Sequence, residues 1–232
     1  MSGPLRVEVI ATSVEDAVAA ARGGADRLEV VRDLRRQGLT PSIDLVRQIQ
    51  REVPTPLRVM VRESDGFACA SSDERRALVD HAAALDALGV EGIVIGWTRH
   101  DLVDEETLGR VLQAGPSLRA TFHRAFDAMP DPEGALRTLQ RYPQIDHVLT
   151  GAGIGAWASR CATLARYSRW AGAQITVLPG GGIDEDAIRA VAACGCVTEV
   201  HVGRAARVRH AVDGAVSIDA VRALRRAAGW ND

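Results

Sequence analysis

The 232-residue sequence contains no lysine, so all 28 of its basic residues are arginine. Chemistry that passes through a lysine Schiff base, as in class I aldolases, is therefore excluded. The 30 acidic residues nearly balance the arginines, the formal charge is −2, and the sequence has neither a polybasic tail nor an acidic block. We therefore expect no nucleic acid and no membrane among its partners.

Long apolar runs are also missing. None reaches the length of a transmembrane helix, and the first residues do not have the form of a secretory signal, so we expect a cytoplasmic protein. The chain is large enough to fold without disulfides, and we expect reduced thiols at its four cysteines, Cys69, Cys161, Cys194 and Cys196. The Cys-Gly-Cys at 194–196 is only a weak signal for a soft metal.

Short runs rich in Val, Ile and Leu alternate with longer segments in which apolar residues recur every three or four positions. This alternation predicts strand–helix units and a parallel sheet. The runs cover residues 6–11, 26–31, 57–61, 92–96, 118–123, 147–150, 175–178 and 199–203. Eight such units predict a TIM (β/α)₈ barrel, with residues 1–232 as a single domain. The alternative is an open doubly wound sheet, which normally has glycines after its first strand, and residues 9–17 contain none.

Several predicted strands carry charges, although a strand covered on both faces should be apolar. Because strand side chains alternate, Glu199 and His201 share one face while Val200 and Val202 share the other. If the valines face the helices, a charged set points into the barrel: Glu8, Arg27, Glu29, Arg62, His123, Glu199 and His201. Buried charges must pair with one another or with a ligand. For any one of these residues, an internal ion-pair network and an active site both remain open.

The loops after the last two predicted strands are rich in glycine, with PGGGID at 179–184 and VGRAAR at 202–207. Backbone N–H groups at Gly181, Gly182 and Gly203, helped by Arg204, would hold a phosphate or carboxylate where many barrels bind phosphate. A tight turn before the next helix explains the same glycines equally well.

Ordered motifs along most of the chain resemble the copper homeostasis protein CutC family. They are VEVIATS (7–13), GADRLEV (24–30), GLTPS (38–42), TFHRAFD (121–127), VLTGAG (148–153), PGGGI (179–183) and EVH (199–201). The resemblance implies a TIM barrel, a cytoplasmic homo-oligomer and copper(I) binding. It also implies copper-binding cysteines at positions that here hold Ile10, Ala11 and Val31. Cys69 lies near another family cysteine and stays a weak candidate metal ligand.

Two functions remain open. The first is a copper(I)-binding homeostasis protein, as the resemblance implies, with Cys69, or Cys194 and Cys196, as thiol ligands. The second is a barrel enzyme that acts on a small anionic, sugar- or phosphate-like substrate at the C-terminal face. Proton transfer there would lead to isomerisation, elimination or carbon–carbon cleavage.

The enzyme hypothesis assigns roles to the polar residues. Glu8, Glu29 or His123 acts as general acid or base. Arg62 and Arg124 hold a carboxylate or stabilise an enolate. The full set of candidate catalytic residues is Glu8, Glu29, Arg62, His123, Arg124, Asp127 and His201.

Two of these assignments leave alternatives open. Arg124 and Asp127, which follow the fifth predicted strand, either clamp the substrate or brace the loop. A divalent metal held by Glu8, Glu29 and His201 is a further possibility, because carboxylates and imidazole suit such ions better than copper(I).

Overall fold

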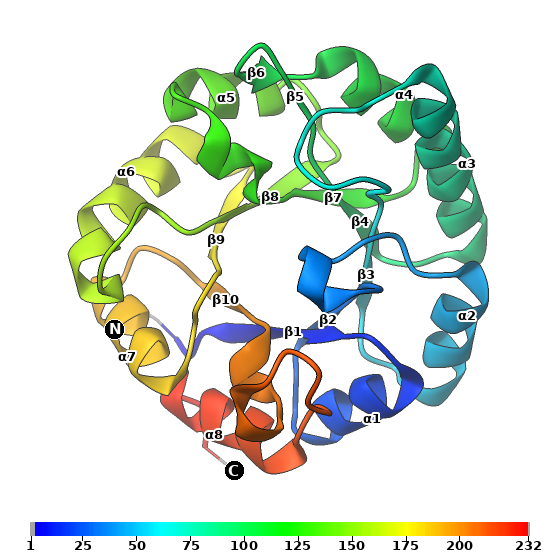
Figure 1. The fold of residues 1–232 in the computed structure, drawn as a ribbon. Coiled ribbons are helices and arrows are strands. Elements are labelled where there is room, and N and C mark those ends of the chain that lie inside the picture. Colours follow the sequence, from blue (N-terminus) through cyan, green and yellow to red (C-terminus); the bar gives the residue numbers. More distant parts are fainter. Residues whose placement is uncertain (1–2, 232) are drawn as a thin grey trace.

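The computed structural model describes residues 3–231 and confirms the predicted TIM barrel. Its parallel strands form one ring in the order β10-β1-β2-β3-β4-β7-β8-β9, seen end-on in Figure 1. They are β1 Arg6–Ala11, β2 Arg27–Val30, β3 Leu57–Met60, β4 Gly92–Ile95, β7 Arg119–Phe122, β8 Ile145–Thr150, β9 Thr176–Pro179 and β10 Glu199–Val202. A bridge between Gly180 and His201 brings β9 and β10 together and closes the ring.

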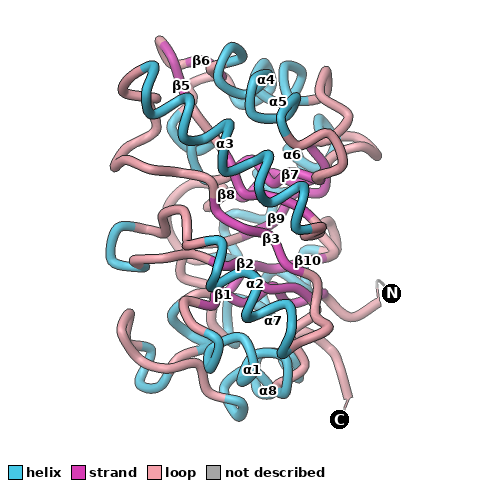
Figure 2. Tube along the Cα trace, turned by 90° about the vertical axis from the view of Figure 1, so that its right-hand side faces the viewer, coloured by secondary structure: helices cyan, strands magenta, loops and turns pink. Residues whose placement is uncertain are grey.

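Helices surround the strands on the outside, as the side view in Figure 2 shows. They are α1 Val14–Arg22, α2 Ile43–Glu52, α3 Ser72–Leu88, α4 Glu105–Ala114, α5 Pro132–Leu139, α6 Cys161–Ala171, α7 Glu185–Cys194 and α8 Ile218–Ala227. Serine hydroxyls at Ser13, Ser42, Ser71 and Ser217 accept backbone N–H bonds, which fixes where four of these helices begin. Within residues 3–231, no helix has the length and apolar character needed to cross a membrane.

Shorter elements occupy the loops. A hairpin of β5 (Thr98–Arg99) and β6 (Leu102–Val103) follows β4. Single 3₁₀ turns are η1 Leu34–Arg36, η2 Arg124–Ala128, η3 Trp157–Arg160, η4 Arg204–Ala206 and η5 Val208–His210. Four of these five turns follow the C-terminal end of a barrel strand, namely η1, η2, η3 and η4, and η3 leads into α6. They therefore shape the C-terminal mouth, where barrel sites form.

The predicted alternation of side chains along the strands is confirmed. Val200 and Val202 of β10 are fully buried in the large core between strands and helices. Glu199 and His201 of the same strand instead contact charged residues of β1 and β2 inside the barrel. The barrel interior is therefore polar along one arc, and the helix-facing layer carries the hydrophobic core.

The expectation of four reduced thiols is wrong for two of them. Cys161, the first residue of α6, forms a disulfide with Cys194, the last residue of α7, with 5.5 Å between their Cα atoms. Cys69 and Cys196 are free. The packing of α6 beside α7 brings the two cysteines together from 33 positions apart, and spacing in the sequence gives no sign of it. Cys194 is therefore not available to pair with Cys196 as a metal ligand.

Candidate functional site

Near the N-terminal ends of the strands, the barrel interior is an ion-pair network centred on Arg27, the first residue of β2. Its guanidinium contacts the carboxylate of Glu8 through Nε. Its Nη2 donates to Glu199 Oε2 at 2.7 Å. His147 lies 3.2 Å from the same Glu199 oxygen. Burial alone would raise the pKa of Glu199, but the hydrogen bond from His147 and the charge of Arg27 lower that pKa to about 2.

A second buried arginine, Arg58 of β3, extends this network. It contacts both carboxylate oxygens of Asp146, the carboxylate of Glu91 and the hydroxyl of Thr121. His147 Nδ1 lies 2.8 Å from Asp146. Because Arg27, Arg58, Asp146, His147 and Glu199 occupy one another's donors and acceptors, they hold the barrel together, whereas Glu8 keeps Oε1 directed at His201.

Closer to the C-terminal ends of the strands, three residues face one another from neighbouring strands. Nδ1 of His201 lies 2.7 Å from Glu8 Oε1 and 3.4 Å from Glu29 Oε2. All three side chains are buried, and one potential metal-ligating atom from each lies within 4.8 Å of the other two. The structure thus brings together Glu8, Glu29 and His201.

The three groups differ in proton affinity. Burial raises the pKa of Glu29 to about 7, close to neutrality. The pKa of Glu8 is instead held well below its usual range, because Arg27 and His201 outweigh the effect of burial. Burial lowers the pKa of His201, but the nearby carboxylates of Glu29 and Glu8 outweigh it and raise that pKa overall. One acid that stays ionised and one that titrates near neutrality is an arrangement suited to proton transfer.

His123 follows β7 directly and is almost fully buried. Its Nδ1 accepts a hydrogen bond from the N–H of Ala125, so the ring proton is on Nε2. Nε2 has no hydrogen-bond partner among the described residues. Burial, together with the positive charge of Arg62, lowers the pKa of His123 to about 3. His123 is therefore a neutral imidazole with one free N–H.

A substrate clamp would present a free guanidinium to the barrel mouth, but the guanidinium of Arg62 is bound to loop carbonyls. Its guanidinium donates to the carbonyl oxygens of Arg36, Gly38 and Gly66, and it also lies 5.9 Å from the ring centre of Phe67. These contacts tie the loops after β2 and β3 to each other. The positive charge stays near the mouth, where it acts on His123.

Arg124 and Asp127 lie together in η2. Arg124 Nε donates to Asp127 at 2.8 Å, and Asp127 accepts from the hydroxyl of Thr150 and the N–H of Gly151. Asp127 thus braces the loop after β8. The Arg124 side chain is about half exposed and lies against Gly181, so it also faces the loop after β9.

The four residues predicted to bind an anion lie on two adjacent loops of the mouth. Gly181 and Gly182 have φ angles of +93° and +75°, which favour glycine, and the described chain leaves open space where a Cβ of Gly182 would point. A Cβ at Gly203 would meet the side chain of Ile10, and the side chain of Arg204 is exposed. The backbone at Gly182 is therefore open to approach from the side on which a Cβ would lie.

Thiols do not line this polar interior among residues 3–231. Cys69 is half-buried in the loop after β3, with Sγ 3.5 Å from the carbonyl oxygen of Ser71. Of the positions that the family resemblance assigns to copper cysteines, Ile10 and Val31 pack with Met60 and Val94 in a small apolar cluster inside the barrel. This cluster forms the apolar side of the interior next to the charged residues.

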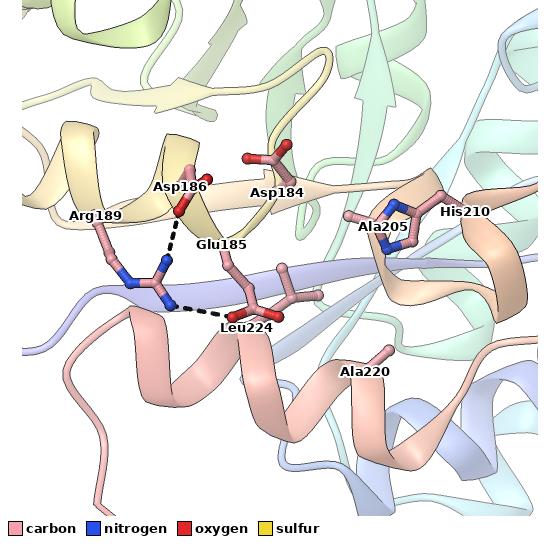
Figure 3. A pocket seen from close by; sticks show the side chains of 8 residues that line it. All are labelled: Asp184, Glu185, Asp186, Arg189, Ala205, His210, Ala220 and Leu224. Atoms are coloured by element: carbon pink, nitrogen blue, oxygen red, sulfur yellow. Dashed lines mark hydrogen bonds and ion pairs between the residues drawn. The ribbon is translucent and has the colours of Figure 1, made fainter.

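A separate cavity of about 330 Å³ lies on the outside of the barrel between α7 and α8. Figure 3 shows its lining, with Arg189 paired to Glu185 and Asp186, and His210 on the other side. None of the residues that line it belongs to the predicted site. Arg189 is thus paired with two of the cavity's acids at the surface, as in an ordinary groove between helices.

Three residues of the interior network were not predicted from the sequence: Arg58, Asp146 and His147. Arg58 and His147 carry the same signal that identified Arg27, a charged residue inside a predicted strand. Asp146 could not be found in this way, because the pairing of β7 with β8 shifts between Ala120 and Thr121.

Comparison with known proteins places the chain among proteins of one family. A sequence model described as the CutC family matches residues 5–206. A CutC family protein of Mesorhizobium japonicum is 36% identical over 179 residues, which cover 77% of this chain and 69% of the relative. A human protein named copper homeostasis protein cutC homolog is 33% identical over 196 residues, covering 84% of this chain and 71% of the relative.

Solved structures agree with the barrel. The CutC structure from Streptococcus agalactiae has a TM-score of 0.79 at 20% identity, covering 86% of this chain and 98% of that one. A phosphoribosyl anthranilate isomerase structure has a TM-score of 0.64 at 14% identity, covering 97% and 98%. At these identities the likeness concerns the fold alone.

Proposed function

The chain belongs to the CutC family, and we propose that this member acts on a small anionic, sugar- or phosphate-like molecule by proton transfer at the mouth of its barrel. The observation that carries the proposal is that Glu29 Oε2 and His123 Nε2, on two residues of the predicted site, are among the four buried side-chain atoms without hydrogen-bond partners in residues 3–231. Such atoms are costly to bury. A polar ligand that accepts from one and donates to the other would remove that cost.

The protonation states support roles for these residues. Glu29, with a pKa near 7, can take up and release a proton at neutral pH, as a general base must. The neutral His123 offers an N–H to a substrate oxygen on which negative charge develops. His201, held between Glu8 and Glu29, would orient Glu29 and pass its proton on. The reaction would be an isomerisation, an elimination or a carbon–carbon cleavage.

The glycine loops would hold the distal anion. Their supporting feature is the open approach to the backbone at Gly182. Arg124, which is half exposed beside Gly181, adds a positive charge to the same side of the mouth. An anion bound there would lie between the loops after β9 and β10, the position that many barrels use for phosphate.

Ligand identification by mass spectrometry tests the proposal. We expect natively purified protein to retain a small anionic molecule that His123→Ala does not. His210→Ala is the matched control, because His210 is exposed and lines the outer cavity. Equal ligand content in wild type and His123→Ala, or loss in His210→Ala alone, would contradict the proposal.

Copper(I) binding is the second candidate, and the name of the human relative favours it. Copper(I) prefers thiolate and thioether ligands, and Cys69 is the free thiol near the mouth, on the loop whose Phe67 packs against His123. Anaerobic titration against a chelator tests it. We expect Cys69→Ser to abolish binding and Cys196→Ser to leave it unchanged. Failure of the wild type to compete with a modest chelator would contradict it.

Location and assembly follow from the family resemblance as further parts of the proposal. We infer a cytoplasmic homo-oligomer. Light scattering on the eluted peak of a sizing column measures the assembly, and a mass equal to one chain of 24.8 kDa would contradict it.

A further inference from the structure

Glu8, Glu29 and His201 come from β1, β2 and β10, three strands that lie side by side in the barrel. A carboxylate oxygen of each glutamate and a ring nitrogen of the histidine lie within 4.8 Å of one another. The three side chains are 2%, 3% and 6% exposed, so their ligating atoms are directed at one another rather than at solvent. Donor atoms this close to one another can be ligands of a single ion.

An independent sign of a missing ligand is the second carboxylate oxygen of Glu29. Oε2 is buried and receives no hydrogen bond from the described residues, and His201 Nδ1 approaches it only to 3.4 Å. Other carboxylates of the interior are satisfied by arginine, since Glu8 and Glu199 both contact Arg27. A buried carboxylate oxygen without a donor carries a desolvation cost that a cation removes.

The surroundings of the three residues also suit a bound ion. Arg27 holds Glu8 through Oε2 and leaves Oε1 directed at His201, as partners behind metal ligands commonly do. On the other side, the Cα of Ile10 pairs with that of Glu29, and Ile10 begins the apolar cluster. An apolar neighbour excludes water and strengthens the attraction between the carboxylates and a cation.

We propose that Glu8, Glu29 and His201 bind one divalent first-row transition metal ion inside the barrel. The donor set is two oxygens and one nitrogen, which suits zinc, manganese or ferrous iron and does not suit copper(I). Three protein ligands leave coordination positions open to a small molecule. The inference is independent of the proposed function and competes with it for Glu29: a bound ion makes Glu29 a ligand in place of a general base, and binding of the ion is measured without any substrate.

Calorimetric titration of the full chain tests the site, after metal has been stripped with a chelator. The probes are Zn²⁺ and Mn²⁺, each alone. We expect one equivalent per chain for at least one of them. Glu29→Gln keeps the shape of the side chain but removes its charge, and we expect it to weaken binding by at least about 100-fold, the upper range for disturbing a metal site from its outer shell.

Two controls separate this site from others. Glu185→Gln removes an acid of the outer cavity, and Cys69→Ser removes the free thiol, and we expect neither to change the affinity. Binding that survives in Glu29→Gln, or that is lost in Glu185→Gln alone, would overturn the inference. Absence of binding of both ions to the wild type would overturn it as well.

A measurement on the wild type covers the case in which Glu29→Gln does not fold. Crystals soaked in manganese chloride should show an anomalous difference peak between His201 and the two glutamates. A peak confined to the outer cavity, or none, overturns the inference. Loss of the metal site would leave the mass-spectrometric test of the proposed function unaffected, so the two can fail separately.

Discussion

The Arg58 guanidinium donates two hydrogen bonds, of 2.6 and 2.8 Å, to the two carboxylate oxygens of Asp146. It also donates to Glu91 at 3.0 Å. Arg58 is 1% exposed, so its charge depends on these partners. Replacing Arg58 by methionine keeps a long side chain but removes the guanidinium, so that Asp146 and Glu91 lose their positively charged partner. We expect a loss of about 3 kcal/mol in the free energy of unfolding, measured with urea.

Arg189→Met is the matched control for this prediction. Arg189 also contacts two carboxylates, Glu185 and Asp186, but it is largely exposed on α7. Exposed pairs contribute little, and we expect a change within about 1 kcal/mol. Equal losses for the two variants would show that the interior network does not hold the barrel together.

His147 should make stability depend on pH on the alkaline side. Burial lowers its pKa, but hydrogen bonds to Asp146 and Glu199 outweigh burial and raise it above the value of about 6.5 in an unfolded chain. The protonated form therefore stabilises the fold fully below about pH 6.5, and this stabilisation is lost as the pH rises through the folded-state pKa.

Urea midpoints from about pH 6 to about pH 9 measure this effect. We expect the wild type to lose stability relative to His147→Gln as the pH rises, because the variant has no proton to lose at this position. All other titrating groups are common to both proteins and cancel in the difference. Parallel curves would contradict a raised pKa for His147.

The disulfide between Cys161 and Cys194 predicts a thiol count. Under denaturing conditions without reductant, Ellman's reagent should detect two thiols, those of Cys69 and Cys196. The bond closes a loop of 33 residues, so its reduction should lower the free energy of unfolding by about 4 kcal/mol. Cys69→Ser, a control, should reduce the count by one without this loss. Four thiols before reduction would contradict the pairing.

The barrel and the interior acids were predictable because both depend on local patterns. Alternation along a strand placed Glu8 and His201 on the same side as Glu29, and the parallel order of strands brought them together. A charge inside a buried strand is unusual enough to identify such residues from the sequence.

Other features depend on packing between distant segments. Asp146 turns inward at a register shift that no residue type announces. Arg62 has the same sequence signal as Arg27, yet it bonds to loop carbonyls rather than to a carboxylate. Cys161 meets Cys194 only because α6 packs beside α7. Sequence patterns therefore identify inward positions, and the partner of each depends on tertiary structure.

The apolar cluster inside the barrel gives a direct test of where this family could hold copper. Ile10 and Val31 stand at positions where the family resemblance implies thiols. Both pack together with Met60. The double variant Ile10→Cys/Val31→Cys places two thiols beside a thioether, which is the donor set that copper(I) prefers. We expect this variant to bind one copper(I) per chain against a chelator that strips the wild type.

Two further variants and a folding check make this result specific to the cluster. Adding Met60→Leu to the double variant should weaken binding if the thioether is a ligand, whereas Met129→Leu, in the separate helix-facing core, should not. Each exchange to cysteine removes buried carbon atoms, so a loss of about 1 to 2 kcal/mol is expected, and urea unfolding checks that the barrel persists. A folded double variant with no more affinity than the wild type would show that positions 10 and 31 cannot form a copper site in this barrel. Binding by the double variant alone would show that this chain has the geometry of a copper site without its ligands.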